Sequence, residues 1–141
     1  MSDAQRQRQR RTYLDMIDRI GTRWVDVFDG DADFYSTAYW DLLTTMWAAD
    51  APMRKTEALA ALKGVKSAHT AGKYLDAAIR RGLVEERCNP NDARSKLVAL
   101  SPAMQARLNT FFDAAVAEVK ATAADLDGIP ETGGDPEKGG G

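Results

Sequence analysis

The chain has 141 residues, of which 44% are hydrophobic and 28% are charged, and its formal net charge is −2. This length suits one domain, and the longest apolar runs fall far short of the roughly 20 residues that a membrane helix requires. The polar N-terminal stretch lacks the apolar segment of a secretory signal. A single cysteine, Cys88, excludes an internal disulfide and suits a reducing, cytoplasmic location without membrane contact.

The charged residues are unevenly distributed along the sequence. Residues 52–98 carry a net charge of +5, whereas residues 12–51 carry −6 and residues 99–141 carry −4. A basic middle between acidic flanks is expected of a protein that presents one face to a polyanion. The alternative is that these basic residues form ordinary solvated surface.

The N-terminal part of the chain divides into two segments. Residues 1–11 are polar, carry a net charge of +3 and lack apolar periodicity, so we expect a disordered basic arm. Apolar side chains then recur at helical spacing, among them Tyr13, Ile17 and Trp24. This pattern predicts a helix over residues 12–28.

The acidic run "DGDAD" over residues 29–33 is the next feature. An EF-hand loop would need glycine and glutamate at the positions of Phe34 and Trp40, so a calcium site is not expected. We expect Asp33 to cap a second helix instead, because a carboxylate can accept a hydrogen bond from an unpaired backbone N–H. That helix must end before Pro52.

Two further helices and a hairpin are predicted in the middle of the chain. A short helix is expected over residues 56–64, and Ser67 is expected to cap a longer helix that ends at Gly82. The β-prone segments "LVEERC" and "KLVAL" follow. They are separated by "NPNDARS", whose composition is typical of a hairpin loop.

The last helix completes a recognisable order of elements. Ser101 and Pro102 are expected to be its N-cap and first helical residue, and residues 129–141 are predicted to be a disordered Gly/Pro-rich tail. The predicted fold is mainly α with a small β-hairpin (α+β), a winged helix-turn-helix with N- and C-terminal dimerisation helices. One domain would span residues 12–128, with a DNA-binding core over about residues 52–100.

Catalysis is not expected from this sequence. The single histidine, His69, has no aspartate three or four positions away, and Cys88 has no neighbour that would act as a base. No glycine-rich phosphate loop occurs, and one histidine with one cysteine does not predict a zinc site. We therefore expect neither an enzyme nor a bound metal or cofactor.

The helix before the hairpin and the hairpin itself can contact DNA. In a helix-turn-helix, the first turns of the second helix reach base edges in the major groove. Arg94 at the loop can enter the adjacent minor groove, where negative potential is concentrated, and Asp92 can fix the loop as an Asx turn. The alternative is a surface hairpin with incidental charge. The predicted DNA-binding residues are Ser67, His69, Thr70, Lys73, Arg87, Arg94 and Lys96.

Residues 56–108 resemble the MarR family of winged-helix transcription regulators. The segment "RRGLVEER" is similar to the family's passage from recognition helix to wing, and "NPNDARSKLVALSP" is similar to its wing signature. The resemblance implies a homodimer that binds a palindromic DNA site, usually as a repressor. It gives Asp92 and Arg94 the wing-tip role. It implies that the positions contacting bases and phosphates are His69, Thr70 and Lys73.

The two terminal helices carry apolar side chains that one domain cannot easily bury. Pairing with a second copy of the chain would cover them, and the alternative is that they cover the core of the monomer itself. The predicted dimer-interface residues are Tyr13, Ile17, Trp24, Phe111 and Phe112. The resemblance also implies a small aromatic effector, for which Trp24, Tyr39, Trp40 and Trp47 can line a cleft; aromatic side chains at helical spacing are otherwise core.

These observations lead to one principal hypothesis and one alternative. The principal hypothesis is a sequence-specific DNA-binding transcription regulator that represses by occupying a promoter as a homodimer, released by a small aromatic ligand. Lysine and arginine would supply salt-dependent affinity, and the helix would supply sequence readout. The alternative is a winged-helix interaction module whose basic face docks an acidic protein partner.

Overall fold

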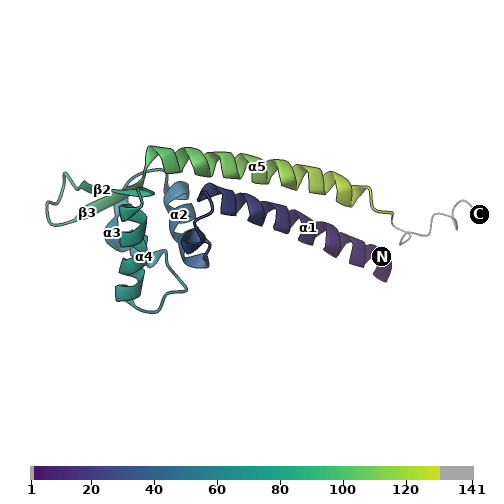
Figure 1. The fold of residues 1–141 in the computed structure, drawn as a ribbon, viewed down its shortest axis with the longest axis horizontal. Helices are drawn as coiled ribbons and strands as arrows, with labels where there is room; N and C mark the ends of the chain where they lie inside the picture. The colour runs from purple at the N-terminus through teal and green to yellow at the C-terminus, as the bar shows by residue number, and fades with distance from the viewer. Residues whose placement is uncertain (1, 131–141) are drawn as a thin grey trace, which may run out of the picture. The chain divides into compact units, whose positions relative to one another are not determined.

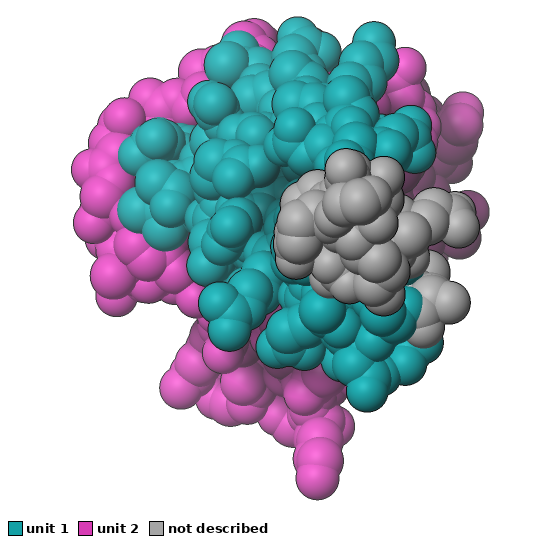
Figure 2. Space-filling model, turned by 90° about the vertical axis from the view of Figure 1, so that its right-hand side faces the viewer, with its two compact units in different colours: residues 1–27, 110–141 teal, residues 28–109 magenta. Residues whose placement is uncertain are grey.

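The computed structural model describes residues 2–130, so most of the predicted tail lies outside the described residues. The chain forms two compact units, coloured separately in Figure 2. Unit 1 comprises residues 1–27 and 110–141, and unit 2 comprises residues 28–109. Within residues 2–130, no helix combines the length and apolar character needed to cross a membrane.

Unit 1 pairs two long helices side by side (Figure 1). They are α1 (Asp3–Val27) and the C-terminal part of α5 (Pro102–Asp127). The ring of Trp24 meets the ring of Phe111 edge-on, with centroids 5.2 Å apart. Further along the pair, Arg19 Nε donates a hydrogen bond of 2.9 Å to Glu118 Oε1. An aromatic contact and an ion pair therefore fix the two helices in antiparallel register.

The prediction of a disordered arm is wrong for residues 3–11, which form the first turns of α1. The backbone N–H of Gln5 donates to Ser2 Oγ at 3.1 Å, and Arg6 pairs with Asp3 one turn earlier. Alanine, glutamine and arginine have high helix propensities, and pairs three residues apart stabilise a helix further. This segment has no apolar stripe that would predict a helix, because its helical character comes from polar residues.

Unit 2 begins with a loop and a single 3₁₀ turn, η1 (Ala32–Phe34), before its first full helix. The Asp31 Oδ1 atom accepts from the N–H of Asp33 at 3.1 Å and starts that turn. Consequently Ser36, and not Asp33 as predicted, is the N-cap of the following helix; its Oγ accepts from the N–H of Tyr39 at 3.4 Å. The helices of unit 2 that precede α5 are α2 (Thr37–Ala49), α3 (Lys55–Ala60) and α4 (Ala68–Arg80).

The predicted hairpin is confirmed and belongs to a three-stranded antiparallel sheet. Its strands β2 (Val84–Cys88) and β3 (Lys96–Leu100) flank the loop, and β3 also pairs with β1 (Met53–Arg54), giving the order β1–β3–β2. The sequence did not predict β1, because two residues are too few to show the alternation that identifies a strand. The mainly helical fold with a small sheet is as predicted.

The core of unit 2 draws on each of its layers. Helix α4 buries one row, Ala71, Leu75 and Ala78, at helical spacing. Ser67 caps this helix, and Gly82 follows its end with φ +75°, as predicted for a glycine that terminates a helix. The largest side chains with less than 2% of their surface exposed are Leu42, Leu43, Leu75, Val84, Val98, Met104 and Leu108.

The ion pair in unit 1 predicts a pH dependence of stability. The hydrogen bond from Arg19 lowers the pKa of Glu118, and the same bond raises the pKa of Arg19. A carboxylate with a lowered pKa in the folded state stabilises the fold above its ordinary pKa, about 4.3, and loses this contribution as pH falls through the folded-state pKa.

We therefore expect Glu118→Gln to lower the thermal unfolding midpoint at pH 7, with a difference from the wild type that shrinks below about pH 4. Thermal unfolding followed by circular dichroism between these pH values measures the effect. Asp113→Asn, an exposed change on the same helix, is the matched control. A difference between Glu118→Gln and wild type that stays constant with pH would contradict the role given to the carboxylate.

Candidate nucleic-acid interface

The first turns of α4 combine a fixed start with an open polar surface. Ser67 Oγ accepts from the N–H of Thr70 at 3.1 Å and donates to Thr70 Oγ1 at 2.9 Å. The hydroxyl of Ser67 therefore serves the helix cap, although the sequence prediction placed it among the DNA contacts. His69, Thr70 and Lys73 are exposed, whereas Ala71 between them is buried. The predicted base-contacting side chains thus lie on the solvent side of a helix anchored by its other face.

The loop of the hairpin is ordered by its own side chains. Asn89 Oδ1 accepts from the N–H of Asn91 at 2.9 Å, and Asp92 Oδ1 accepts from the N–H of Arg94 at 3.0 Å. The predicted Asx turn at Asp92 is therefore confirmed. Two such turns in succession hold the backbone of Arg94 while its side chain stays exposed.

The strand register separates two cations that the sequence prediction treated alike. Arg87 pairs with Leu97, and Lys96 pairs with Cys88. Partners across an antiparallel ladder share a face, and neighbours along a strand alternate. Arg87 and Lys96 therefore lie on opposite faces of the hairpin and cannot reach phosphates from the same face. Arg87 also has Glu85 beside it, with Nη2 and Oε2 3.6 Å apart.

A lysine that the sequence analysis overlooked links three elements of unit 2. Lys55 Nζ lies 3.1 Å from Glu86 Oε2 on β2 and 4.0 Å from Asp76 Oδ1 on α4. These residues are 31 and 21 positions away from Lys55 in the sequence, so no local pattern could have identified the contact. The network neutralises acidic side chains close to the helix and the hairpin.

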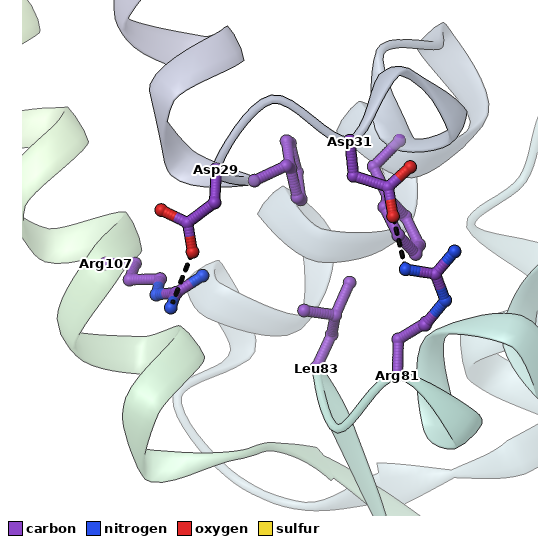
Figure 3. Close-up of a pocket in the computed structure, with 7 residues that line it drawn as sticks. Asp29, Asp31, Arg81, Leu83 and Arg107 are labelled. Atoms are coloured by element: carbon purple, nitrogen blue, oxygen red, sulfur yellow. Dashed lines mark hydrogen bonds and ion pairs between the residues drawn. The ribbon is translucent and has the colours of Figure 1, made fainter.

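A second group of charges surrounds a cavity of about 410 Å³ in unit 2 (Figure 3). On one side Arg107 Nη2 lies 3.1 Å from Asp29 Oδ2, and on the other Arg81 pairs with Asp31. Between the two pairs the floor is apolar, and Leu83 lies at its centre. The acids of the "DGDAD" run are therefore paired with arginines.

The predicted dimer residues separate into exposed and internal groups. Tyr13 and Ile17 are exposed, but Phe111 is only 3% exposed and contacts Trp24 and Phe112 within one chain. The sequence prediction missed other open positions on the same two helices. Among the described residues of unit 1, the exposed large apolar side chains are Tyr13, Leu14, Ile17, Val116 and Val119.

The aromatic residues proposed for an effector cleft have other contacts. Tyr39 is 4% exposed and packs edge-on against Phe34 and Tyr74; burial raises the pKa of its hydroxyl. Trp47 Nε1 donates a hydrogen bond of 2.8 Å to Asn109 Oδ1. Tyr39 therefore belongs to the core. Over residues 2–130 no cluster of three or more histidine, cysteine or acidic side chains is arranged to hold a metal ion.

Comparison with solved structures identifies the class of fold. The chain is similar to a transcriptional regulator from Thermotoga maritima, with 17% identity and a TM-score of 0.58 over 85% of this chain and 81% of that chain. It is also similar to a mutant of MarR from E. coli complexed with operator DNA, with 20% identity and a TM-score of 0.51 over 87% of this chain and 80% of that chain. No protein-family model and no curated protein matches. The similarity confirms, for the fold, the resemblance to MarR-type winged-helix regulators.

Proposed function

We propose that the protein is a DNA-binding transcription regulator in which α4 enters the major groove and the hairpin of β2 and β3 serves as the wing. One observation carries the proposal: unit 2 presents an exposed polar helix face and an ordered loop that exposes Arg94, both anchored to one core. The similarity to a MarR protein complexed with operator DNA supports DNA as the partner.

Different side chains make different kinds of contact with DNA in this proposal. His69, Thr70 and Lys73 can donate hydrogen bonds to purine acceptors or phosphates, and the small Gly72 lets the α4 backbone approach the duplex closely. Arg94 places its guanidinium in the neighbouring minor groove, where a narrow groove concentrates negative potential. The cations supply a salt-dependent affinity through counterion release.

We also propose that the protein acts as a homodimer on a palindromic site and represses by occupying a promoter. Five large apolar side chains of unit 1 are between 40% and 56% exposed, all on α1 and α5. A second copy of the chain can cover such a face and place two copies of α4 on the duplex. A small aromatic effector stays a prediction of the family resemblance, since Tyr39 is part of the core.

Removing one wing cation and one helix cation tests DNA binding. Arg94→Ala and Lys73→Ala should each weaken binding to duplex DNA and reduce the slope of log affinity against log salt by roughly 0.9 for each lost phosphate contact. Fluorescence anisotropy across salt concentrations measures both effects. Lys120→Ala, which removes an exposed charge from α5 in unit 1, is the control and should bind as the wild type does. Equal binding by all four proteins would favour an acidic protein partner instead.

A charged residue on the open face of unit 1 tests the homodimer. Ile17→Glu should convert a dimer into a monomer that remains folded, because Ile17 is 40% exposed in the single chain and its replacement removes little of the core. Sedimentation velocity gives the mass, and circular dichroism gives the helix content. Thr22→Glu, at an exposed position on the same helix, should stay dimeric. A wild-type protein that sediments as a monomer at micromolar concentration would rule out this face as a dimer interface.

A further inference from the structure

An ion pair joins the C-terminal end of α4 to the loop before α2. Arg81 directly follows the helix, and its Nη1 donates to Asp31 Oδ2 while its Nη2 lies 3.7 Å from Asp33 Oδ2. The guanidinium also lies over the ring of Phe34, 5.5 Å from its centroid. Figure 3 shows this pair at one edge of the cavity, on the opposite side from Arg107. Arg81 is thus held by two carboxylates and an aromatic face.

Asp31 is fixed from two directions. Its Oδ1 atom accepts from the N–H of Asp33 and starts the 3₁₀ turn, while its Oδ2 atom binds Arg81. Only 26% of the Asp31 side chain is exposed. A surface ion pair ordinarily contributes little, because two mobile side chains must be ordered to form it. Here the carboxylate is already held by the backbone turn, so less entropy is lost when Arg81 binds.

The apolar side chains in the buried row of α4 are mostly small. Two of the three side chains in its buried row are alanines, and Leu75 is the only large one. Tyr74 adds an edge-on ring contact with Tyr39 at 5.2 Å. Methyl groups offer few contacts that resist tilting of a helix, since dispersion attraction grows with the number of atoms in contact. A contact at the helix end therefore has a large share in setting the helix direction.

The geometry converts a small tilt into a displacement at the DNA-reading end. Arg81 and His69 are twelve positions apart, which is roughly 18 Å along a helix at 1.5 Å per residue. A tilt of about 10° over that length displaces the reading end by about 3 Å, well beyond the roughly 0.5 Å within which a recognition site must be held.

We propose that the Asp31–Arg81 pair is a positioning contact that fixes the direction of α4 and thereby sets DNA affinity and sequence discrimination. This inference rests on the proposed DNA-binding function. Arg81 acts through the helix, because its two terminal nitrogens face carboxylates of the same chain. The pair thus differs from the cations of α4 and the wing, which act on the duplex itself.

The substitution Asp31→Asn separates positioning from simple electrostatics. Asparagine keeps an oxygen that can cap the 3₁₀ turn and removes the negative charge that binds Arg81. Loss of an acid makes the protein more positive, so electrostatics alone would tighten DNA binding. A change in the direction of α4 would instead weaken DNA binding. Asp29→Asn is the matched control, because it makes the same charge change in the same loop but breaks the pair with Arg107 on α5.

We expect Asp31→Asn to weaken DNA binding at least about fivefold, which is the lower end of typical coupling between sites. The variant should also discriminate less well between a duplex selected for binding from a random-sequence pool and a duplex of random sequence. Asp29→Asn should bind as tightly as the wild type or more tightly. Arg81→Lys keeps the charge but cannot engage two carboxylates in fork geometry. Its DNA affinity should therefore lie between the affinities of Asp31→Asn and the wild type. Fluorescence anisotropy with both duplexes measures these effects. The measurements use one salt concentration and a temperature well below the unfolding midpoint of each variant.

The outcomes distinguish this inference from the function on which it rests. If the wild type binds duplex DNA and Asp31→Asn binds equally or more tightly, the positioning role is wrong while DNA binding stands. If the wild type does not bind duplex DNA, the proposed function fails, and the positioning role fails with it. Should Asp31→Asn not fold, Arg81→Lys decides, because wild-type affinity and discrimination in that variant would also overturn the inference.

Discussion

One narrow row of buried side chains on α4 determines what the molecule can present to a partner. Ala71, Leu75 and Ala78 decide which face of the helix is buried against the rest of unit 2, and helical geometry then directs His69 and Lys73 to the opposite side. The strands β2 and β3, which carry the ordered loop, are anchored in the same core through the buried side chains of Val84 and Val98. Helix α4 and the hairpin of β2 and β3 therefore share one core, which the proposed recognition of a duplex of fixed geometry requires.

The basic segment and the open apolar face lie in different units. The segment around α3, α4 and the wing is basic, whereas the segments flanking it are acidic apart from the first eleven residues. Unit 1 also carries the open apolar face on α1 and α5. Under the proposed function, the basic segment favours contact of DNA with unit 2, and the apolar face favours contact with a second chain. In the proposed function, DNA and a second chain therefore contact different parts of the molecule.

Local sequence signals predicted most of the helices and strands. They could not predict contacts between residues that are distant in the sequence. Ser67, Gly82 and Ser101 mark helix ends through hydrogen bonds or dihedral angles that depend on neighbouring residues, so the sequence located α4 and α5 well. The sequence did not predict the helical start of α1, because polar residues without an apolar stripe form it. The pairing of Asp31 with Arg81 spans fifty positions, and the opposed faces of two hairpin cations depend on strand register across a seven-residue loop. Neither leaves a local pattern.

Selection of bound duplexes from a random-sequence pool tests most directly whether unit 2 reads DNA as a paired winged helix. We expect an inverted repeat whose half-sites lie about one helical turn, roughly 10 base pairs, apart, because two copies of α4 related by two-fold symmetry must enter successive major grooves. Enrichment of a single half-site would retain DNA reading and contradict the homodimer. Recovery of no common sequence, with binding to random duplex no tighter than that of an unrelated acidic protein, would contradict DNA recognition itself.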